Sequence, residues 1–223
     1  MKTALITGAG TGLGKELALL LSEKGYFIYA CGRNKETLNE TIREITEHGG
    51  QGEALTLDVR SFEDVSSKIA GLSRPIDLLV NNAGVGFFGP FLQSTYDEMN
   101  QMFTTNVYGP IFLTKAVLPS MRERNNGVVL NIISTAGLRG KKNEALYVAS
   151  KFALRGFTES LQKEYEGTGI RFVAAYMGGM NTPFWDDSDH ISDKSRLRSP
   201  KEVAEFIVQR FETESEIVIE SKK

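Results

Sequence analysis

The sequence predicts an α/β fold, a doubly wound parallel sheet with helices on both faces, formed by residues 1–223 as one domain. Two observations predict this class. Short apolar runs alternate with segments of helical periodicity along the whole chain. The apolar runs are also nearly continuous, as is typical of strands buried on both faces. The chain has no internal repeat or low-complexity linker that would mark a boundary between domains.

The first elements form a strand–turn–helix–strand unit. An apolar run at residues 4–6 stops at a glycine-rich turn, and helical spacing follows from Leu17 to Leu21 and stops at Gly25. A second apolar run, residues 26–31, is the next expected strand. Such a unit sets the N–H groups and positive dipole of a helix N-terminus beyond the end of a strand, where they suit a phosphate.

The later elements keep the same alternation. We expect helices at residues 35–48, 95–124, 145–165 and 200–211, with a break near Gly109-Pro110, and one more helix, capped by Ser61, that carries Val65, Ile69 and Leu72. Strands are expected at residues 54–57, 76–80, 128–133, 171–177 and 217–219. Residues 183–199 lack clear periodicity, which predicts a substrate lid.

Composition excludes several kinds of protein. The formal net charge is −2, from 26 Lys+Arg and 28 Asp+Glu, so neither a nucleic-acid partner nor a membrane surface is expected. No apolar run approaches the roughly 18 residues of a membrane helix. The one cysteine, Cys31, excludes an internal disulfide, and its apolar strand favours a buried small residue over a nucleophile. Two separated histidines, His48 and His190, predict no metal site. We expect a soluble, cytoplasmic protein.

The glycine-rich turn is the first candidate binding site. Its glycines, Gly8, Gly12 and Gly14, have the spacing G-x-x-x-G-x-G, and they permit a tight turn and close approach of a pyrophosphate to the backbone. An ordinary strand-to-helix turn is the alternative. Because the carboxyl ends of parallel strands share one edge, Arg33, Asp58, residues 81–84, Ser134 and Gly178 should meet this turn there.

Candidate chemistry rests on Tyr147 and Lys151. At positions i and i+4 they share a helix face, and a nearby ammonium should lower the tyrosine pKa toward the neutral range that acid–base catalysis needs. The alternative is that both simply cover a helix surface. Ser134 follows the strand at residues 128–133, so its hydroxyl and the phenol should emerge at neighbouring element ends, where one carbonyl oxygen could touch both.

Taken together, these motifs resemble those of the short-chain dehydrogenase/reductase family over essentially the whole chain. The matching residues, in family order, are Thr7-Gly8-x-x-x-Gly12-x-Gly14, Asp58, Asn81-Asn82-Ala83-Gly84, Asn106, Ser134 and Tyr147-x-x-x-Lys151. The resemblance implies a Rossmann-like fold and a hydride-transferring oxidoreductase that interconverts a carbonyl compound and its alcohol.

The resemblance also implies a role for each site residue. Tyr147 would protonate the carbonyl oxygen, Lys151 would hold the nicotinamide ribose and lower the Tyr147 pKa, Ser134 would donate to the substrate oxygen, and Asn106 would hold a proton-relaying water. The implied cofactor-binding residues are Gly8, Thr11, Gly12, Leu13, Gly14, Arg33, Asp58, Val59, Asn82, Ala83, Gly84, Tyr147, Lys151, Gly178, Met180 and Thr182. Alternatively, Asn81 and Asn82 merely end a strand, and Asn106 bonds backbone at the helix break.

NADP(H) is the expected cofactor. The strand at residues 26–31 ends at Gly32, without the carboxylate that usually accepts a ribose hydroxyl, and Arg33 follows, whose guanidinium can bind a 2′-phosphate through two hydrogen bonds. Thr11 could add a donor. The alternatives are a solvated Arg33, an arginine stacked on adenine, or one drawn away by Glu36 and Glu40.

The substrate is expected to be a modest, largely apolar carbonyl compound, a small-molecule partner enclosed by Phe87, Phe88, Leu138, Met177, Met180, Phe184 and Trp185. A 3-oxoacyl thioester on a carrier is the alternative substrate, because Arg139, Lys141 and Lys142 form a basic cluster. The alternative function is a non-catalytic dinucleotide-binding regulator or scaffold. By resemblance we expect a homodimer, paired through residues 99–121 and 147–165. One departure from the family is Met177-Gly178-Gly179, where Pro-Gly is common.

Overall fold

The protein is described by a computed structural model of residues 1–186, 190–191, 193, 195 and 197–221. Its centre is a seven-stranded sheet in which all neighbours are parallel, with the order β3-β2-β1-β4-β5-β6-β7. The strands are β1 (Thr3–Thr7), β2 (Phe27–Gly32), β3 (Gln51–Thr56), β4 (Leu78–Asn81), β5 (Gly127–Ser134), β6 (Ile170–Met177) and β7 (Glu216–Ile219). The order reverses between β1 and β4, where such sheets bind ligands.

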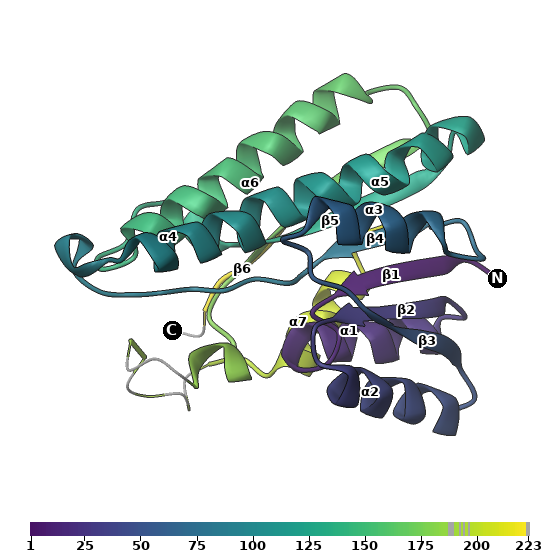
Figure 1. Ribbon diagram of the computed structural model, residues 1–223, viewed down its shortest axis with the longest axis horizontal. Helices are drawn as coiled ribbons and strands as arrows, with labels where there is room; N and C mark the ends of the chain where they lie inside the picture. Colours follow the sequence, from purple (N-terminus) through teal and green to yellow (C-terminus); the bar gives the residue numbers. More distant parts are fainter. Residues whose placement is uncertain (187–189, 192, 194, 196, 222–223) are drawn as a thin grey trace.

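Helices cover both faces of this sheet, as Figure 1 shows: α1, α2 and α7 lie on one side, and α3 to α6 lie on the other. They are α1 (Gly12–Glu23), α2 (Lys35–Glu47), α3 (Phe62–Ala70), α4 (Tyr96–Phe103), α5 (Gly109–Arg124), α6 (Ala145–Glu164) and α7 (Pro200–Val208). The predicted Rossmann-like architecture and the order of its elements are confirmed. None of the helices in the described residues has the length and apolar character needed to cross a bilayer.

The near-continuous apolar strands are explained by these two layers. In β1, Ile6 faces a core that includes Leu17 of α1, while its neighbour Leu5 faces a second core that includes Leu113 of α5. Successive strand residues point to opposite faces, so a sheet covered on both sides needs apolar residues at every position. Cys31 on β2 is fully buried, and burial raises its thiol pKa, as expected for a packing residue.

The predicted helix at residues 95–124 is divided earlier than expected. A π-helical segment, Thr104–Tyr108, separates α4 from α5, and Pro110 lies in the first turn of α5. Its missing N–H costs little there, because the first N–H groups of a helix lack partners in any case. The break is therefore π-helical, and it carries Asn106 inward to 1% exposure.

A chain of polar side chains is buried between the sheet and α6. Asn81 of β4 lies opposite Asn131 of β5 in the parallel register, and its Nδ2 donates to Asn131 Oδ1 at 2.8 Å. Asn131 Nδ2 donates to the Thr158 hydroxyl, also at 2.8 Å, which in turn donates to the carbonyl of Leu154. Asn81 therefore does more than end a strand.

Candidate active site

The glycine turn makes a cradle that side chains would fill. Gly8 and Gly12 have φ values of 65° and 54°, which favour glycine. A Cβ on Gly14 would overlap the Gly8 carbonyl oxygen and lie 2.5 Å from Asn82 Nδ2. Thr11 occupies the N-cap of α1 without a side-chain capping bond. The turn thus presents backbone and the start of a helix, as a pyrophosphate requires.

Asn82 and Ala83 hold this turn against the end of β4. The Thr7 hydroxyl accepts from the backbone N–H groups of Asn82 and Ala83, at 3.0 and 2.9 Å. Asn82 Nδ2 donates to the Thr7 carbonyl at 2.9 Å. The amide of Asn82 therefore fixes the two strands that flank the point where the sheet order reverses.

Two adjoining cavities follow the carboxyl edge of the sheet. One has a volume of about 570 Å³ and is lined by predicted site residues, among others: Gly8, Thr11, Gly12, Leu13, Arg33, Asn82, Ala83, Gly84, Ser134, Tyr147, Lys151, Gly178, Met180 and Thr182. The other, about 750 Å³, adds Asp58 and Val59. Five residues line both cavities, namely Gly8, Thr11, Arg33, Ala83 and Gly84. We call the two together the groove; it suits an extended dinucleotide, with Gly14 and Asn106 behind its wall.

Arg33 lies where the two cavities join. Its side chain is exposed and forms no hydrogen bond or ion pair with any residue that the structure describes, so neither Glu36 nor Glu40 draws it away. Asp58 is engaged instead by Arg60, whose Nε and Nη2 donate to its carboxylate at 2.6–3.1 Å. That hydrogen bonding lowers the pKa of Asp58, with a smaller contribution from the charge of Arg33.

Ser134 and Tyr147 meet as predicted. Ser134 ends β5, Tyr147 lies in the first turn of α6, and their side chains share a hydrogen bond. The predicted direction of the Tyr147 pKa is wrong, however. Burial of the phenol raises its pKa above the ordinary value, the Ser134 hydrogen bond lowers it, and the nearby Glu144 carboxylate raises it further. Because desolvation outweighs the other effects, the phenol keeps its proton at neutral pH.

Lys151 is buried beside this phenol rather than paired with it. Its Nζ lies 5.7 Å from the centroid of the Tyr147 ring and donates to the carbonyl of Ile132 at 3.2 Å. Burial lowers the pKa of Lys151 to about 8. A Cβ on Gly84 would lie 3.7 Å from this Nζ, so the lysine reaches the wall formed by the residues after β4.

Asn106 forms the backbone hydrogen bonds expected in the alternative interpretation. Its Oδ1 accepts from the N–H of Val85 at 2.9 Å, and its Nδ2 donates to the Val85 carbonyl at 2.8 Å and to the Ser150 hydroxyl at 3.1 Å. Ser150 donates in turn to the carbonyl of Tyr147 at 2.7 Å. Ser150 was not predicted as a site residue, although its place between Tyr147 and Lys151 was a signal. It joins α6, the π segment and the loop after β4.

An aromatic wall faces Tyr147. The Phe88 ring packs edge-on against Tyr147, with centroids 5.3 Å apart, and lies nearly parallel to the rings of Trp185 and His190, at 5.2 and 4.7 Å. Phe184 also contacts Tyr147. Four predicted pocket residues, Met177, Met180, Phe184 and Trp185, line the groove. The other three do not: Phe87 and Phe88 pack against the small cluster that contains Tyr147, and Leu138 packs against a small core formed by β5, β6 and α6.

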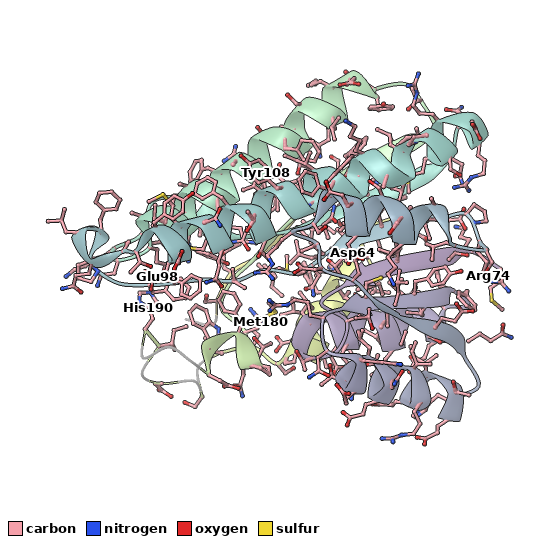
Figure 2. All side chains as sticks on the ribbon, viewed as in Figure 1. Asp64, Arg74, Glu98, Tyr108, Met180 and His190 are labelled. Atoms are coloured by element: carbon pink, nitrogen blue, oxygen red, sulfur yellow. The ribbon has the colours of Figure 1, made fainter. Side chains whose placement is uncertain are left out.

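Glu144 and His190 were missed as site residues. Glu144 is the only carboxylate among the described residues that line the smaller cavity, and its Oε1 lies 3.0 Å from His190 Nε2. Glu144 stands three residues before Tyr147, a spacing that could have indicated its position. His190 lies in the segment after β6, and no spacing in the sequence indicates that it reaches Glu144. Figure 2 shows His190 and Met180, which both belong to this segment.

Two members of the predicted basic cluster form ion pairs. Arg139 pairs with Glu220 at 2.8 Å and Lys141 with Glu144 at 3.8 Å, so both cations face carboxylates. The predicted lid at residues 183–199 begins with a short 3₁₀ turn, Pro183–Trp185. Its residues 187–189, 192, 194 and 196 lie outside the described part of the chain.

Known proteins share both this sequence pattern and this fold. The family model described as short chain dehydrogenase matches residues 2–192. A putative ketoacyl reductase of Streptomyces coelicolor is 34% identical, over 92% of this chain and 88% of its own length. Actinorhodin polyketide ketoreductase, solved with NADPH, superposes with a TM-score of 0.89 at 30% identity, covering 99% of this chain and 95% of its own.

A fold-level relative carries a different nucleotide. A short chain dehydrogenase/reductase from Burkholderia phymatum, in complex with NAD, has a TM-score of 0.89 at 23% identity and covers 97% of this chain and 88% of its own; it supports the fold alone. The family model covers most of the chain, and the relatives share its fold over nearly the whole length. The chain is a member of the short-chain dehydrogenase/reductase family of oxidoreductases.

Proposed function

We propose that the protein reduces a carbonyl compound to its alcohol with NADPH, using Tyr147 as the general acid. One observation carries this proposal: Ser134, Tyr147 and Lys151 line the same groove as the glycine cradle and Arg33. A dinucleotide along this groove would place its reactive end beside Tyr147 if its phosphates occupied the cradle. A pure binding module has no need of a hydroxyl, a phenol and a buried ammonium together at that end.

The residues divide the work as follows. When bound, NADPH supplies the hydride for the carbonyl carbon. Tyr147 gives its proton to the carbonyl oxygen, and its phenol holds that proton at neutral pH. The Ser134 hydroxyl donates to the same oxygen and stabilises its developing charge. Lys151, with a pKa of about 8, can bind ribose hydroxyls and return a proton toward Tyr147. Asn106 holds the wall behind Lys151.

NADP(H) is preferred over NAD(H) in this proposal. Arg33 is exposed at the junction of the two cavities, and no carboxylate ends β2 to accept a ribose hydroxyl. A 2′-phosphate on Arg33 would gain charge-assisted hydrogen bonds worth about 1.5–3 kcal/mol, which corresponds to a ratio of tenfold to a hundredfold in kcat/KM.

The cofactor test compares kcat/KM for NADPH and NADH in the wild type and in Arg33→Ala. The variant should lose most of the NADPH preference while its NADH value stays nearly constant. Lys35→Ala, which removes an exposed cation two residues further along, is the matched control and should keep the preference. Equal values for the two cofactors in the wild type would refute the preference, and an unchanged ratio in Arg33→Ala would refute the role of Arg33.

The substrate is proposed to be an apolar ketone or a 3-oxoacyl thioester. Phe184 and Trp185, which line the groove and pack against Phe88, favour apolar groups, and burying such groups gains roughly 25 cal/mol per Å². A relative named ketoacyl reductase supports the acyl class. A panel of aliphatic ketones, aromatic ketones, 3-oxoacyl thioesters and small sugars, assayed by NADPH oxidation, tests it. A preference for the sugars would contradict the apolar wall.

We also propose a homodimer through the outer helices. Several large apolar side chains on α4, the π segment and α6 are exposed: Tyr96, Met99, Tyr108 and Phe152. Figure 2 shows Tyr108 on this helical layer. A second copy would cover these side chains. Light scattering at micromolar concentration should give about twice 24.7 kDa, and Phe152→Glu should lower it; a monomeric wild type would refute the dimer.

A further inference from the structure

The chain segment after β7 packs against the loop after β6. The N–H of Gly178 donates to the carbonyl of Ile219 at 2.8 Å, and the N–H of Gly179 donates to the hydroxyl of Ser221 at 3.2 Å. Ser221 lines the groove together with Gly178, Gly179 and Thr182. We call Glu220 and Ser221 the C-terminal strap.

Close approach of the strap explains the middle residue of Met177-Gly178-Gly179. A Cβ on Gly178 would overlap the backbone nitrogen of Ser221 and lie 2.6 Å from its hydroxyl and 2.9 Å from the carbonyl carbon of Glu220. Only glycine leaves room for the strap at that position. The loop after β6 lacks the proline that is common in the family. Hydrogen bonds to the segment after β7 hold this loop instead.

Glu220 joins three segments. Both of its carboxylate oxygens accept from Arg139 in the loop after β5, at 3.2 and 2.8 Å, and its carbonyl accepts from Arg198 Nε at 3.0 Å. Arg198 is bridged to Met180, and its own carbonyl accepts from the N–H of Asn181 at 2.9 Å. Glu220 is thus connected through Arg198 to the same loop that Ser221 contacts directly.

We propose that the C-terminal strap positions the loop at residues 178–182 for the nicotinamide end of the cofactor. This inference rests on the proposed NADPH-dependent function. Glu220 and Ser221 are positioning residues: they act through the backbone of the loop, and the glycine cradle and Arg33 at the opposite end of the groove do not depend on them.

The test separates the two ends of the cofactor. NADPH and 2′,5′-ADP, which lacks the nicotinamide, are titrated by calorimetry into the wild type, Glu220→Arg, Arg139→Glu and the double exchange variant. Each single reversal should raise the NADPH Kd about tenfold, because like charges then face each other, while the Kd of 2′,5′-ADP changes less than about twofold. The double variant should restore NADPH binding. Lys142→Ala, on the same loop as Arg139, is the control and should change neither Kd.

Amide hydrogen exchange tests the strap without any ligand. The amides of Gly178, Gly179 and Asn181 should exchange about tenfold faster in Glu220→Arg and recover in the double variant. Equal loss of both ligands, or unchanged exchange in Glu220→Arg, would overturn the strap. If the wild type bound neither ligand, the proposed function would fall, and the exchange rates would still decide the strap.

Discussion

At the glycine-turn end of the groove, the cradle lined by Gly8 and Gly12 is mostly backbone from one continuous stretch of chain, and the Arg33 side chain lies beside it. At the Tyr147 end, the surface is made of side chains that come from separate loops and helices, including Ser134, Glu144, Phe184, Trp185 and His190. A backbone site can be built locally and reused, because it needs only glycine and a helix N-terminus. A side-chain site can differ between relatives that share the same fold.

The causes of the pKa shifts also differ between the two ends of the groove. Asp58 at the glycine-turn end is partly exposed, and its pKa is lowered mainly by hydrogen bonds from Arg60. Tyr147 and Lys151 are buried, and desolvation is the first cause of each pKa shift. Solvent screens the first kind of interaction, whereas the second depends on keeping water out of the pocket. The proposed proton transfer therefore needs an enclosed Tyr147 end, whereas the proposed nucleotide binding does not.

Tyr147→Phe should give the largest effect on turnover and should impair only the Tyr147 end of the groove. The variant keeps the ring contacts with Phe88 and Phe184 but loses the proton donor, so kcat should fall about 10²–10⁴-fold. Calorimetric binding of NADPH should stay within about threefold of the wild type, since the cradle is untouched. Near-normal turnover in the purified variant would remove Tyr147 from the proposed chemistry.

Gly14→Ala should damage the other end. Its Cβ would overlap the Gly8 carbonyl oxygen, so the cradle must open, and we expect NADPH affinity to fall about tenfold to a hundredfold with a loss of roughly 1–3 kcal/mol in stability.

Gly156→Ala is the matched control for Gly14→Ala. Gly156 is exposed on α6, and apart from the adjacent backbone of its own helix no heavy atom of the described residues lies within 4 Å of its added Cβ, so this change should stabilise the helix by roughly 0.5–1 kcal/mol without affecting binding. Equal behaviour of the two variants in calorimetry and urea unfolding would contradict the steric explanation.

Lys151→Met should sharpen the contrast in burial between the two ends. At pH 7 the wild type keeps a buried ammonium whose pKa has fallen from 10.5 to about 8, so the free energy of unfolding of the variant should be about 1–3 kcal/mol higher, while its activity is lost.

The lowered pKa of Lys151 determines how this gain in stability changes with pH. Between about pH 8 and 10.5 the unfolded chain binds more protons at Lys151 than the folded protein does, so wild-type stability rises with pH in that window. The advantage of the variant should therefore shrink from pH 7 to pH 10 in urea titrations. An advantage that grew with pH would contradict a buried, charged lysine.

The features predictable from sequence were those with local periodicity. Apolar runs identified all seven strands, and the boundary of β3 was missed by three residues because its first half, Gln51–Glu53, is polar at the sheet edge. The cradle followed from the glycine spacing, and the meeting of Ser134 with Tyr147 followed from their places at element ends. These features need only neighbouring residues and the topology of a parallel sheet.

The missed features depend on contacts between distant segments. The pairing of Glu144 with His190 spans 46 residues, and the contact between Gly178 and Ser221 spans 43, which no periodicity indicates. The direction of the Tyr147 pKa was wrong for a related reason. The i, i+4 spacing shows that a lysine is near but not how completely the surrounding chain removes water from the phenol.

The buried amide pair of Asn81 and Asn131 has a consequence for folding. Apolar strands offer few ways to distinguish the native alignment of neighbours from one shifted along the chain, because valine, leucine and isoleucine fit many positions. A shift of β4 against β5 would separate the two amides and leave each without its hydrogen bond inside the protein, at about 1–3 kcal/mol per group. The two asparagines thus favour the native register of β4 against β5 at the middle of the sheet. They raise the energy of misaligned forms, and they align the strand that carries Asn82 with the strand that delivers Ser134.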